Sequence, residues 1–185
     1  ARTIWNGMID RRPALIVQCA GQADVVRAVR FASERELLIA IRGAGHNIAG
    51  KALADGSFLI DLSGMRAVHV DPKAKRAWVE PGATLGDLDD ETQLFGLATP
   101  TGISSTTGIA GLTLGGGFGW LSKKYGLTVD SLRSAQVVTA AGTVLTASEQ
   151  ENADLFWALR GGGGNFGIVT AFEFELYEVG PTVLS

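Results

Sequence analysis

The sequence Ile41-Arg42-Gly43-Ala44-Gly45-His46-Asn47 decides how this chain is read, because it joins an apolar strand predicted over 38–41 to a glycine-spaced loop. Glycine tolerates positive φ angles, so we expect Gly43 and Gly45 to let successive N–H groups converge on an oxyanion. The guanidinium of Arg42 would add a charged fork. The loop therefore predicts a site for a phosphate-bearing ligand.

His46 supplies a group that phosphate binding does not need. An imidazole at this place serves catalysis or attaches a cofactor, but a loop histidine can also simply bond its own backbone. The chain has two histidines in all. The loop by itself leaves these alternatives open.

Apolar patterning places the loop in a βαβ unit, at a strand end where α/β proteins bind ligands. Strands are predicted over 14–19, 38–41, 58–61, 67–70, 75–79, 134–139, 143–146 and 168–176, with hairpin turns at Asp71-Pro72 and at Ala141-Gly142. Helices are predicted over 22–36, 84–95 and 149–159. This mixture predicts an α+β fold. The change from the βαβ unit to a meander of short strands predicts a lobe boundary near Gly64.

Composition excludes several classes of protein. The 185 residues are 46% hydrophobic and 19% charged, which predicts a folded chain with one sizeable core. The net charge of −3 comes without a basic stripe, so nucleic acid is not an expected partner. No apolar stretch reaches the roughly 18 residues of a membrane helix, so we expect no membrane partner and a cytoplasmic location. The chain begins with Ala1 rather than Met, which we interpret as a fragment or a processed form.

Two further features have plain structural interpretations. The single cysteine, Cys19, lies in an apolar run and is expected to be a small buried hydrophobe. Four acidic residues share the predicted helix over 84–95, and we expect them to form a solvated face without a metal site, because a divalent cation needs converging ligands. These residues are Asp87, Asp89, Asp90 and Glu91.

The 25 glycines are far above the roughly 7% of ordinary proteins and gather in three clusters, 43–50, 108–119 and 161–167. Three consecutive glycines, 115–117, cost backbone entropy, so close passage past a flat or phosphorylated ligand explains them better than a structural role. The sequence lacks both the P-loop pattern of NTPases and the Rossmann glycine fingerprint. We therefore expect three places where backbone approaches one extended ligand of another kind.

Three motifs, taken together and in order, resemble one family over nearly the whole chain. They are 42–47, the run 108–119 followed by Tyr125-Gly126-Leu127, and 156–161 continuing to Gly167-Ile168-Val169. This chain resembles the flavin domain of berberine-bridge-enzyme-like oxidases, in the vanillyl-alcohol-oxidase / p-cresol methylhydroxylase (PCMH-type) superfamily. The resemblance implies a PCMH-type FAD-binding domain of two α+β lobes, 1–64 and 65–180, with FAD between them. Residues 181–185 would begin a linker to an absent substrate domain.

The resemblance also implies which residues hold FAD. His46 would be bonded through a ring nitrogen to the flavin 8α-methyl group. The pyrophosphate and the flavin edge would lie on Arg42, Gly43, Ala44, Gly45 and Asn47. The isoalloxazine and pyrophosphate would pass along Gly102, Ile103, Ser104, Thr107, Gly108, Gly111, Leu112, Gly115, Gly116, Gly117 and Gly119. The adenosine half would lie against Gly164, Asn165, Gly167, Ile168 and Val169.

Two positions depart from relatives that carry two covalent links. Many such relatives bond a cysteine to the flavin C6, where this chain has Ser104, and often carry histidine where this chain has Leu112. The resemblance therefore implies a single link, through His46. Thr107 stands where plant relatives gate access to the flavin C4a region, and its β-branched shape matches the oxidases.

The implied activity is an FAD-linked oxidoreductase. It would transfer a hydride from a small organic substrate, such as a sugar, an alcohol or a secondary metabolite, to the flavin, with molecular oxygen as the acceptor. A dehydrogenase with another acceptor and a flavin-binding module without turnover are the alternatives. No catalytic base is assigned, because the substrate domain of this family lies beyond the chain.

Overall fold

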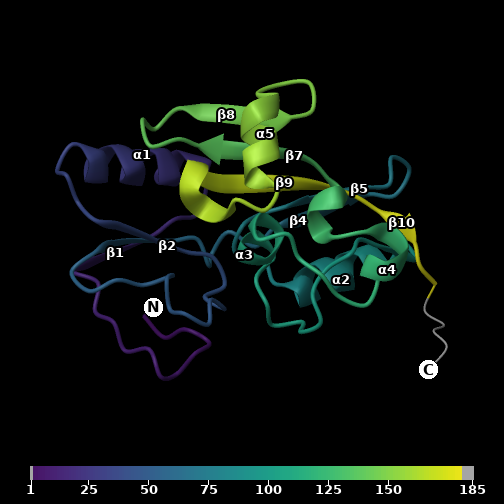
Figure 1. Ribbon diagram of the computed structural model, residues 1–185, viewed down its shortest axis with the longest axis horizontal. Helices are drawn as coiled ribbons and strands as arrows, with labels where there is room; N and C mark the ends of the chain where they lie inside the picture. The colour runs from purple at the N-terminus through teal and green to yellow at the C-terminus, as the bar shows by residue number, and fades with distance from the viewer. Residues whose placement is uncertain (1, 181–185) are drawn as a thin grey trace.

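Among the described residues, a three-stranded and a five-stranded β-sheet form the body of the protein, helices lie beside both of them, and a small two-stranded sheet is separate (Figure 1). The computed structural model describes residues 2–180, so the linker expected over 181–185 lies outside the described residues. Within residues 2–180, no helix is long and apolar enough to cross a membrane. The same stretch holds no group of three or more histidine, cysteine, aspartate or glutamate side chains placed to bind a metal ion.

The first sheet is parallel and contains the three strands expected for the βαβ opening. Its order is β1–β3–β2, with β1 (Leu15–Gln18), β2 (Ile39–Arg42) and β3 (Phe58–Asp61). Phe58 and Ile60 of β3 pack in one apolar cluster with helix α1 (Gln22–Ser33), and Leu59 packs in another with Ala40. Because both faces of β3 are buried, it begins with three consecutive apolar residues, 58–60, rather than with an alternating pattern.

The second sheet is antiparallel and has the order β4–β5–β9–β7–β8. Its strands are β4 (Val68–Asp71), β5 (Arg76–Val79), β7 (Leu132–Val138), β8 (Val144–Ser148) and β9 (Ile168–Glu175). Both expected hairpins, β4–β5 and β7–β8, are confirmed, and Gly142 turns the second with a φ of 70°. A separate pair, β6 (Leu97–Ala98) with β10 (Tyr177–Glu178), was not expected, because two-residue strands carry no periodic pattern.

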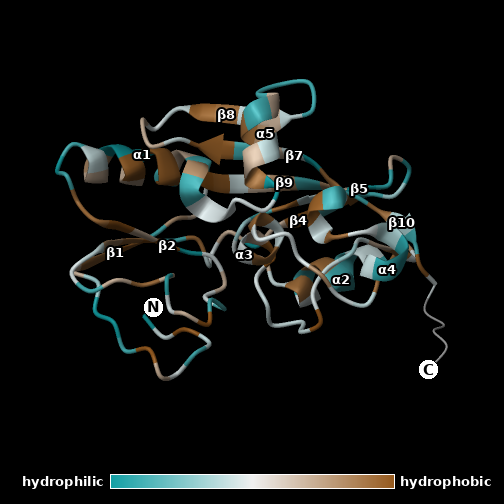
Figure 2. Ribbon diagram, in the orientation of Figure 1, coloured by the Kyte–Doolittle hydropathy of each residue, from teal (hydrophilic) through white to brown (hydrophobic). Residues whose placement is uncertain are grey.

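One face of the second sheet is covered by helices α2 (Leu85–Gln93), α3 (Ile109–Leu114) and α5 (Ala153–Leu159). Phe172 and Phe174 of β9 are fully buried against them. In Figure 2 the strands of this sheet carry long brown hydrophobic stretches, and the loop before α5 is teal. Three further short helices lie outside this layer: α4 (Ser122–Tyr125), η1 (Thr128–Asp130) and η2 (Gly163–Phe166).

Helix α1 connects the two sheets. It lies beside β7 and β9 in Figure 1 and also contacts β3. The side-chain amide of Gln22 donates to Oε1 of Gln136 at 2.8 Å and to Oγ1 of Thr170 at 2.9 Å. The helix ends at Ser33, earlier than the expected 36, because Glu36 takes a left-handed φ of 51° that cannot continue a helix.

Two other sequence expectations need correction. The helix expected over 149–159 begins only at Ala153, after Asn152 in a left-handed conformation. The acidic face of α2 is only partly solvated, because the carboxylate of Asp87 accepts the N–H of Thr84 in a capping box and binds Arg66. Burial raises the pKa of the Asp89 carboxyl, and the neighbouring Asp90 adds to this effect.

Cys19 is buried as expected, with 2% of its surface exposed. Burial, followed by the charges of Asp24 and Asp61, raises the pKa of its thiol to about 11. A thiol attacks only as its thiolate, so we predict no labelling of the folded protein by a thiol reagent at pH 8 and rapid labelling in urea. The absorbance of the released reagent measures the labelling. Rapid labelling of the folded protein would contradict the burial of Cys19.

Candidate functional site

The loop after β2 needs its two glycines for different reasons. Gly45 has a φ of 76°, as expected. The same expectation for Gly43 is wrong, because Gly43 is not among the residues with positive φ. A Cβ atom on Gly43 would instead lie 2.9 Å from the carbonyl oxygen of Pro81, so glycine is required there for a close approach between two backbone segments.

Arg42 lies beneath this loop. Its Nη1 is 3.8 Å from Oδ2 of Asp61, its neighbour across the β2–β3 pairing, and the two side chains are 15% and 1% exposed. A Cβ on Gly45 would lie 3.0 Å from the Arg42 Nε. The guanidinium thus has a carboxylate partner and lies against the turn at Gly45, and its expected role as a phosphate fork stays a prediction.

The imidazole of His46 stacks on the indole of Trp5. The ring centroids are 4.6 Å apart and the planes differ by 25°. His46 is half-buried, and the Trp5 backbone N–H donates to the Gly45 carbonyl at 3.0 Å. Sequence reasoning missed Trp5, because a single aromatic residue near the N-terminus forms no motif with a loop that follows it by about forty positions.

The second glycine cluster meets this loop at the start of α3. A Cβ on Gly108 would lie 2.7 Å from the Cβ of Ala44, and a Cβ on Gly43 would lie 3.8 Å from that of Ala110. No helix is predicted for this segment from its sequence, but residues 109–114 form α3. The first two glycine clusters are therefore in direct contact, as expected for two parts of one site.

Several glycines of the second cluster are explained by the chain's own packing. A side chain on Gly117 would overlap Thr128, one on Gly102 would overlap Leu112, and one on Gly119 would overlap the carbonyl of Thr101. Gly116 and Gly117 also have positive φ angles, of 105° and 73°. A ligand is not needed to explain glycine at these positions.

Two expected site glycines instead face open space. No heavy atom lies within 4 Å of a Cβ built on Gly111, in the middle of α3, or on Gly164, in η2. Helix α3 contacts η2, so these exposed positions belong to neighbouring elements. Bare backbone next to open space is what a flat or phosphorylated ligand requires, and here the residues present fit such a group.

The third glycine cluster, 161–167, comes directly before β9. Asn165 is exposed, and its side-chain amide donates to the Gly162 carbonyl at 2.8 Å. Gly167, with a φ of 142°, leads into β9, where a Cβ would lie 2.7 Å from the Val138 carbonyl oxygen. Ile168 and Val169 are buried, and their expected place beside the cofactor stays a prediction.

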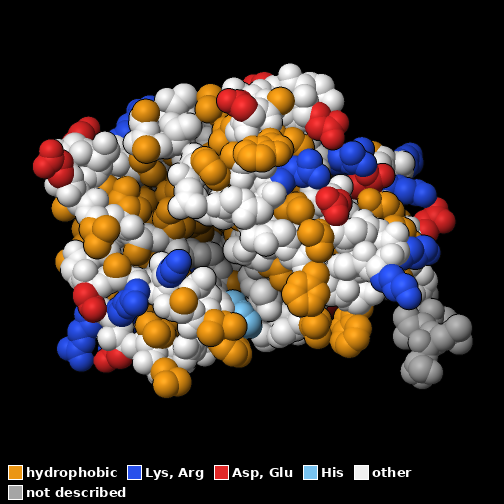
Figure 3. All heavy atoms as spheres, in the orientation of Figure 1, with side chains coloured by type: hydrophobic (Ala, Val, Ile, Leu, Met, Phe, Trp, Pro, Cys, Tyr) orange, Lys and Arg blue, Asp and Glu red, His pale blue; other side chains and the backbone are white. Residues whose placement is uncertain are grey.

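Exposed hydrophobic side chains gather on these same loops. Figure 3 shows many of the orange side chains of this face around its central hollows. The exposed large residues of the glycine-rich segments and of the elements next to them are Trp5, Ile48, Ile103, Phe118, Trp120, Trp157 and Phe166. Apolar surface of this kind indicates contact with a ligand or with further protein.

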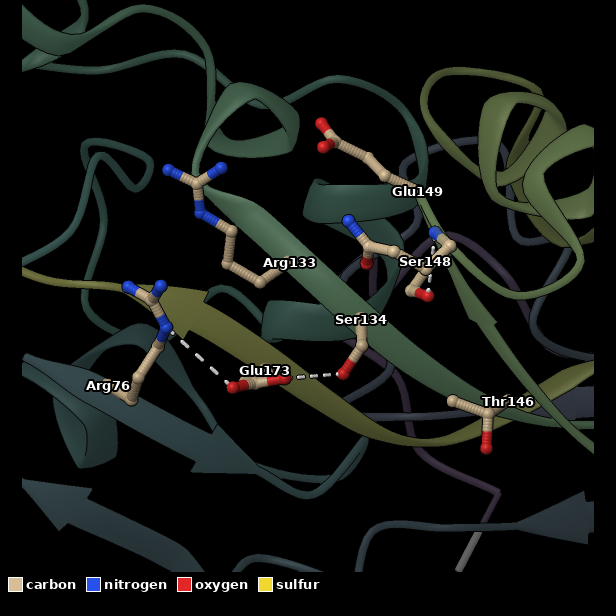
Figure 4. Close-up of a pocket in the computed structure, with 8 residues that line it drawn as sticks. Arg76, Arg133, Ser134, Thr146, Ser148, Glu149 and Glu173 are labelled. Carbon is tan, nitrogen blue, oxygen red and sulfur yellow. Dashed lines mark hydrogen bonds and ion pairs between the residues drawn. The ribbon is translucent and has the colours of Figure 1, made fainter. Parts of the chain in front are cut away.

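A polar hollow of about 390 Å³ lies elsewhere, on the face of the second sheet opposite α2, α3 and α5 (Figure 4). Within it the Oγ of Ser134 donates to Glu173 at 2.6 Å, and the Nε of Arg76 lies 3.7 Å from the same carboxylate. Its lining carries charges of both signs, and none of the three glycine clusters lines it. It is not the candidate site.

The parallel and antiparallel sheets joined by contacting glycine loops define an α+β cofactor-binding domain. Residues 13–148 match the family described as FAD binding domain, and the chain belongs to this family. FAD is therefore its cofactor, and the fold is the expected PCMH-type FAD-binding domain. The expectation of family, fold class and cofactor is confirmed.

Similar proteins include several that are named as oxidases. The chain is 43% identical over 182 residues to (R)-6-hydroxynicotine oxidase of Paenarthrobacter nicotinovorans, covering 98% of this chain and 40% of that protein. The crystal structure of 6-hydroxy-D-nicotine oxidase from Arthrobacter nicotinovorans superposes with a TM-score of 0.93 at 44% identity, covering 96% of this chain and 39% of the other. The structure of glucooligosaccharide oxidase from Acremonium strictum, described with a 6-S-cysteinyl, 8α-N1-histidyl FAD, superposes with a TM-score of 0.88 at 37% sequence identity. The match covers 95% of this chain and 38% of the other. The chain thus spans about 40% of the length of these relatives.

Proposed function

We propose that this chain is the FAD-binding domain of an oxidase that oxidises a small organic molecule, with His46 as the covalent link to FAD. The observation that carries the proposal is the contact of two glycine clusters at Ala44, two residues before His46. Bound FAD supplies the chemistry, because it accepts a hydride from a substrate and passes the electrons to oxygen. Oxidase relatives named for 6-hydroxynicotine and for oligosaccharides support small organic substrates.

The chain's own residues hold and orient the cofactor. Backbone N–H groups of 43–47 serve the pyrophosphate, with Arg42 beneath them, and the bare backbone at Gly111 and Gly164 admits the flat rings. The exposed apolar residues around them exclude water once further protein covers them. The expected lobes, 1–64 and 65–180, form part of this proposal: the parallel sheet ends at Asp61 and the antiparallel sheet begins at Val68.

The residue expected near the flavin C6 position supports a single covalent link, through His46. Ser104 stands where doubly linked relatives carry cysteine, and its hydroxyl lies 3.0 Å from the Thr106 hydroxyl. A hydroxyl does not replace a thiolate as a nucleophile. The only cysteine, Cys19, is buried and its thiol pKa is raised, so it does not supply a second link.

We predict that the intact protein, loaded with FAD and precipitated with acid, gives a yellow pellet whose band fluoresces on a denaturing gel. A covalently attached flavin stays with the unfolded chain, whereas a noncovalently bound flavin is released. A yellow supernatant over a colourless pellet would contradict the His46 link while leaving FAD binding in place. A protein that takes up no FAD at all would contradict the whole proposal.

Oxygen as acceptor is tested by reoxidation. After anaerobic reduction, the intact protein should be reoxidised in air faster than free reduced flavin, and Thr107→Val should leave the rate unchanged, because valine has the same branched shape. Reoxidation no faster than that of free flavin would contradict the oxidase and favour a dehydrogenase with another acceptor. The cytoplasmic location stays a prediction, to be checked by cell fractionation.

A further inference from the structure

The segment before β1 holds the His46 loop through several contacts. Besides the Trp5 N–H bond to Gly45, the side-chain amide of Asn6 donates to the Ile48 carbonyl at 2.7 Å. Ile4 is buried, and its methyl group lies 3.3 Å from the place of a Cβ on Gly45. The stack of Trp5 on His46 is therefore fixed by backbone and side-chain contacts on both sides of the loop.

Contacts farther along keep this segment in place. Nη1 of Arg11 donates to the carbonyls of Gly50 at 3.2 Å and Leu53 at 2.9 Å. A Cβ on Gly50 would lie 2.7 Å from Ile9, so this glycine also permits a close approach. The region that matches the FAD binding domain family begins at residue 13, so Trp5 lies outside it.

We propose that Trp5 is a positioning residue that orients the His46 imidazole for bonding to the flavin. This inference rests on the proposed covalent link at His46. A loop histidine can rotate about two side-chain torsions, whereas a ring stacked at 4.6 Å and 25° keeps its plane, and the stack covers the face of the ring rather than the nitrogens at its edge. Orientation of a reacting group accelerates its reaction without any chemical role for Trp5.

The bond that Trp5 would favour has a simple balance. An imidazole nitrogen of His46 forms a bond to the 8α carbon as the nitrogen loses its proton and the carbon loses one C–H proton. The two electrons of that C–H bond reduce the flavin ring, which also takes up the two protons. Dioxygen then reoxidises the ring and is reduced to hydrogen peroxide.

The test is the rate at which the purified apoprotein incorporates added FAD in acid-stable form. Trp5→Leu keeps an apolar side chain but lacks an aromatic face, and it should slow attachment about tenfold, because small misplacements of a reacting group are costly. Trp5→Phe retains a stacking ring and should restore most of the rate. Attachment by Trp5→Leu at the wild-type rate, or no rescue by Trp5→Phe, would overturn the proposal.

The chain offers a matched control in its other histidine. His69 on β4 lies beside Trp78 on β5, with ring centroids 5.8 Å apart. Neither residue belongs to a glycine cluster. Trp78→Leu also removes an indole from a histidine and should attach FAD at the wild-type rate. Equal slowing by Trp78→Leu and Trp5→Leu would show a general loss of stability and would overturn the specific role of Trp5.

A second readout needs no FAD. At constant pH, the ring-current field of Trp5 should shift the carbon-bound ring protons of His46 in the proton NMR spectrum of the apoprotein, and Trp5→Leu should remove that shift. With the stack present but no acid-stable flavin in the wild type, the proposed link at His46 fails, and the role of Trp5 fails with it. Acid-stable flavin in the wild type without the ring-current shift would overturn only the role of Trp5.

Discussion

His46→Ala should abolish acid-stable flavin while FAD still binds noncovalently. The backbone that approaches the ligand does not depend on this side chain, since the Gly43–Pro81 and Gly108–Ala44 contacts involve other residues. We expect noncovalent affinity to fall by about tenfold or less, because one lost ring contact is worth on the order of 1 kcal/mol. Fluorescence of a denaturing gel measures the covalent flavin, and quenching of FAD fluorescence measures binding.

His69→Ala is the control for this experiment, since it removes the only other histidine. His69 is exposed on β4, and its replacement should leave the fluorescent band unchanged. A fluorescent band that survives His46→Ala would show that another residue forms the link. Loss of all FAD binding in His46→Ala would show instead that the imidazole shapes the loop.

The strands could be predicted because their apolar runs are local signals. Residues 58–61 were predicted within their observed bounds, since burial on both faces makes the first three residues, 58–60, apolar. The hairpin turn at Gly142 was equally readable, because its positive φ favours glycine. The order of the glycine motifs then identified the family, which no single glycine motif could do.

Helix α3 was missed because its six residues include Gly111 and Thr113, both poor helix formers. Its stability comes from packing, since Ile109, Thr113 and Leu114 are buried. The reasons for individual glycines were equally hidden. The contact of Gly43 with Pro81 and that of Gly119 with Thr101 join segments distant in sequence, and only the folded chain shows which glycines face open space.

The buried pair of Arg42 and Asp61 was also beyond sequence reasoning, and it leads to the second large prediction. Arg42→Met keeps an apolar stem but leaves the Asp61 carboxylate, 1% exposed, without its cation. Removing one member of a buried ion pair costs several kcal/mol, and we expect the free energy of unfolding to fall by about 3 kcal/mol. Urea denaturation of the apoprotein, followed by circular dichroism, measures this loss.

Two comparisons separate the buried pair from general effects of removing an arginine. Arg66→Met breaks a more exposed pair with Asp87 and should cost less than about 1 kcal/mol. In the double variant Arg42→Met with Asp61→Asn, no charge is left buried, so it should recover much of the loss. Because the Nε of Arg42 lies beneath Gly45, Arg42→Met should also reduce acid-stable flavin, by loosening the turn that carries His46. If Arg42→Met costs no more than Arg66→Met, the ion pair does not support the loop, and Arg42 is left to serve the pyrophosphate alone.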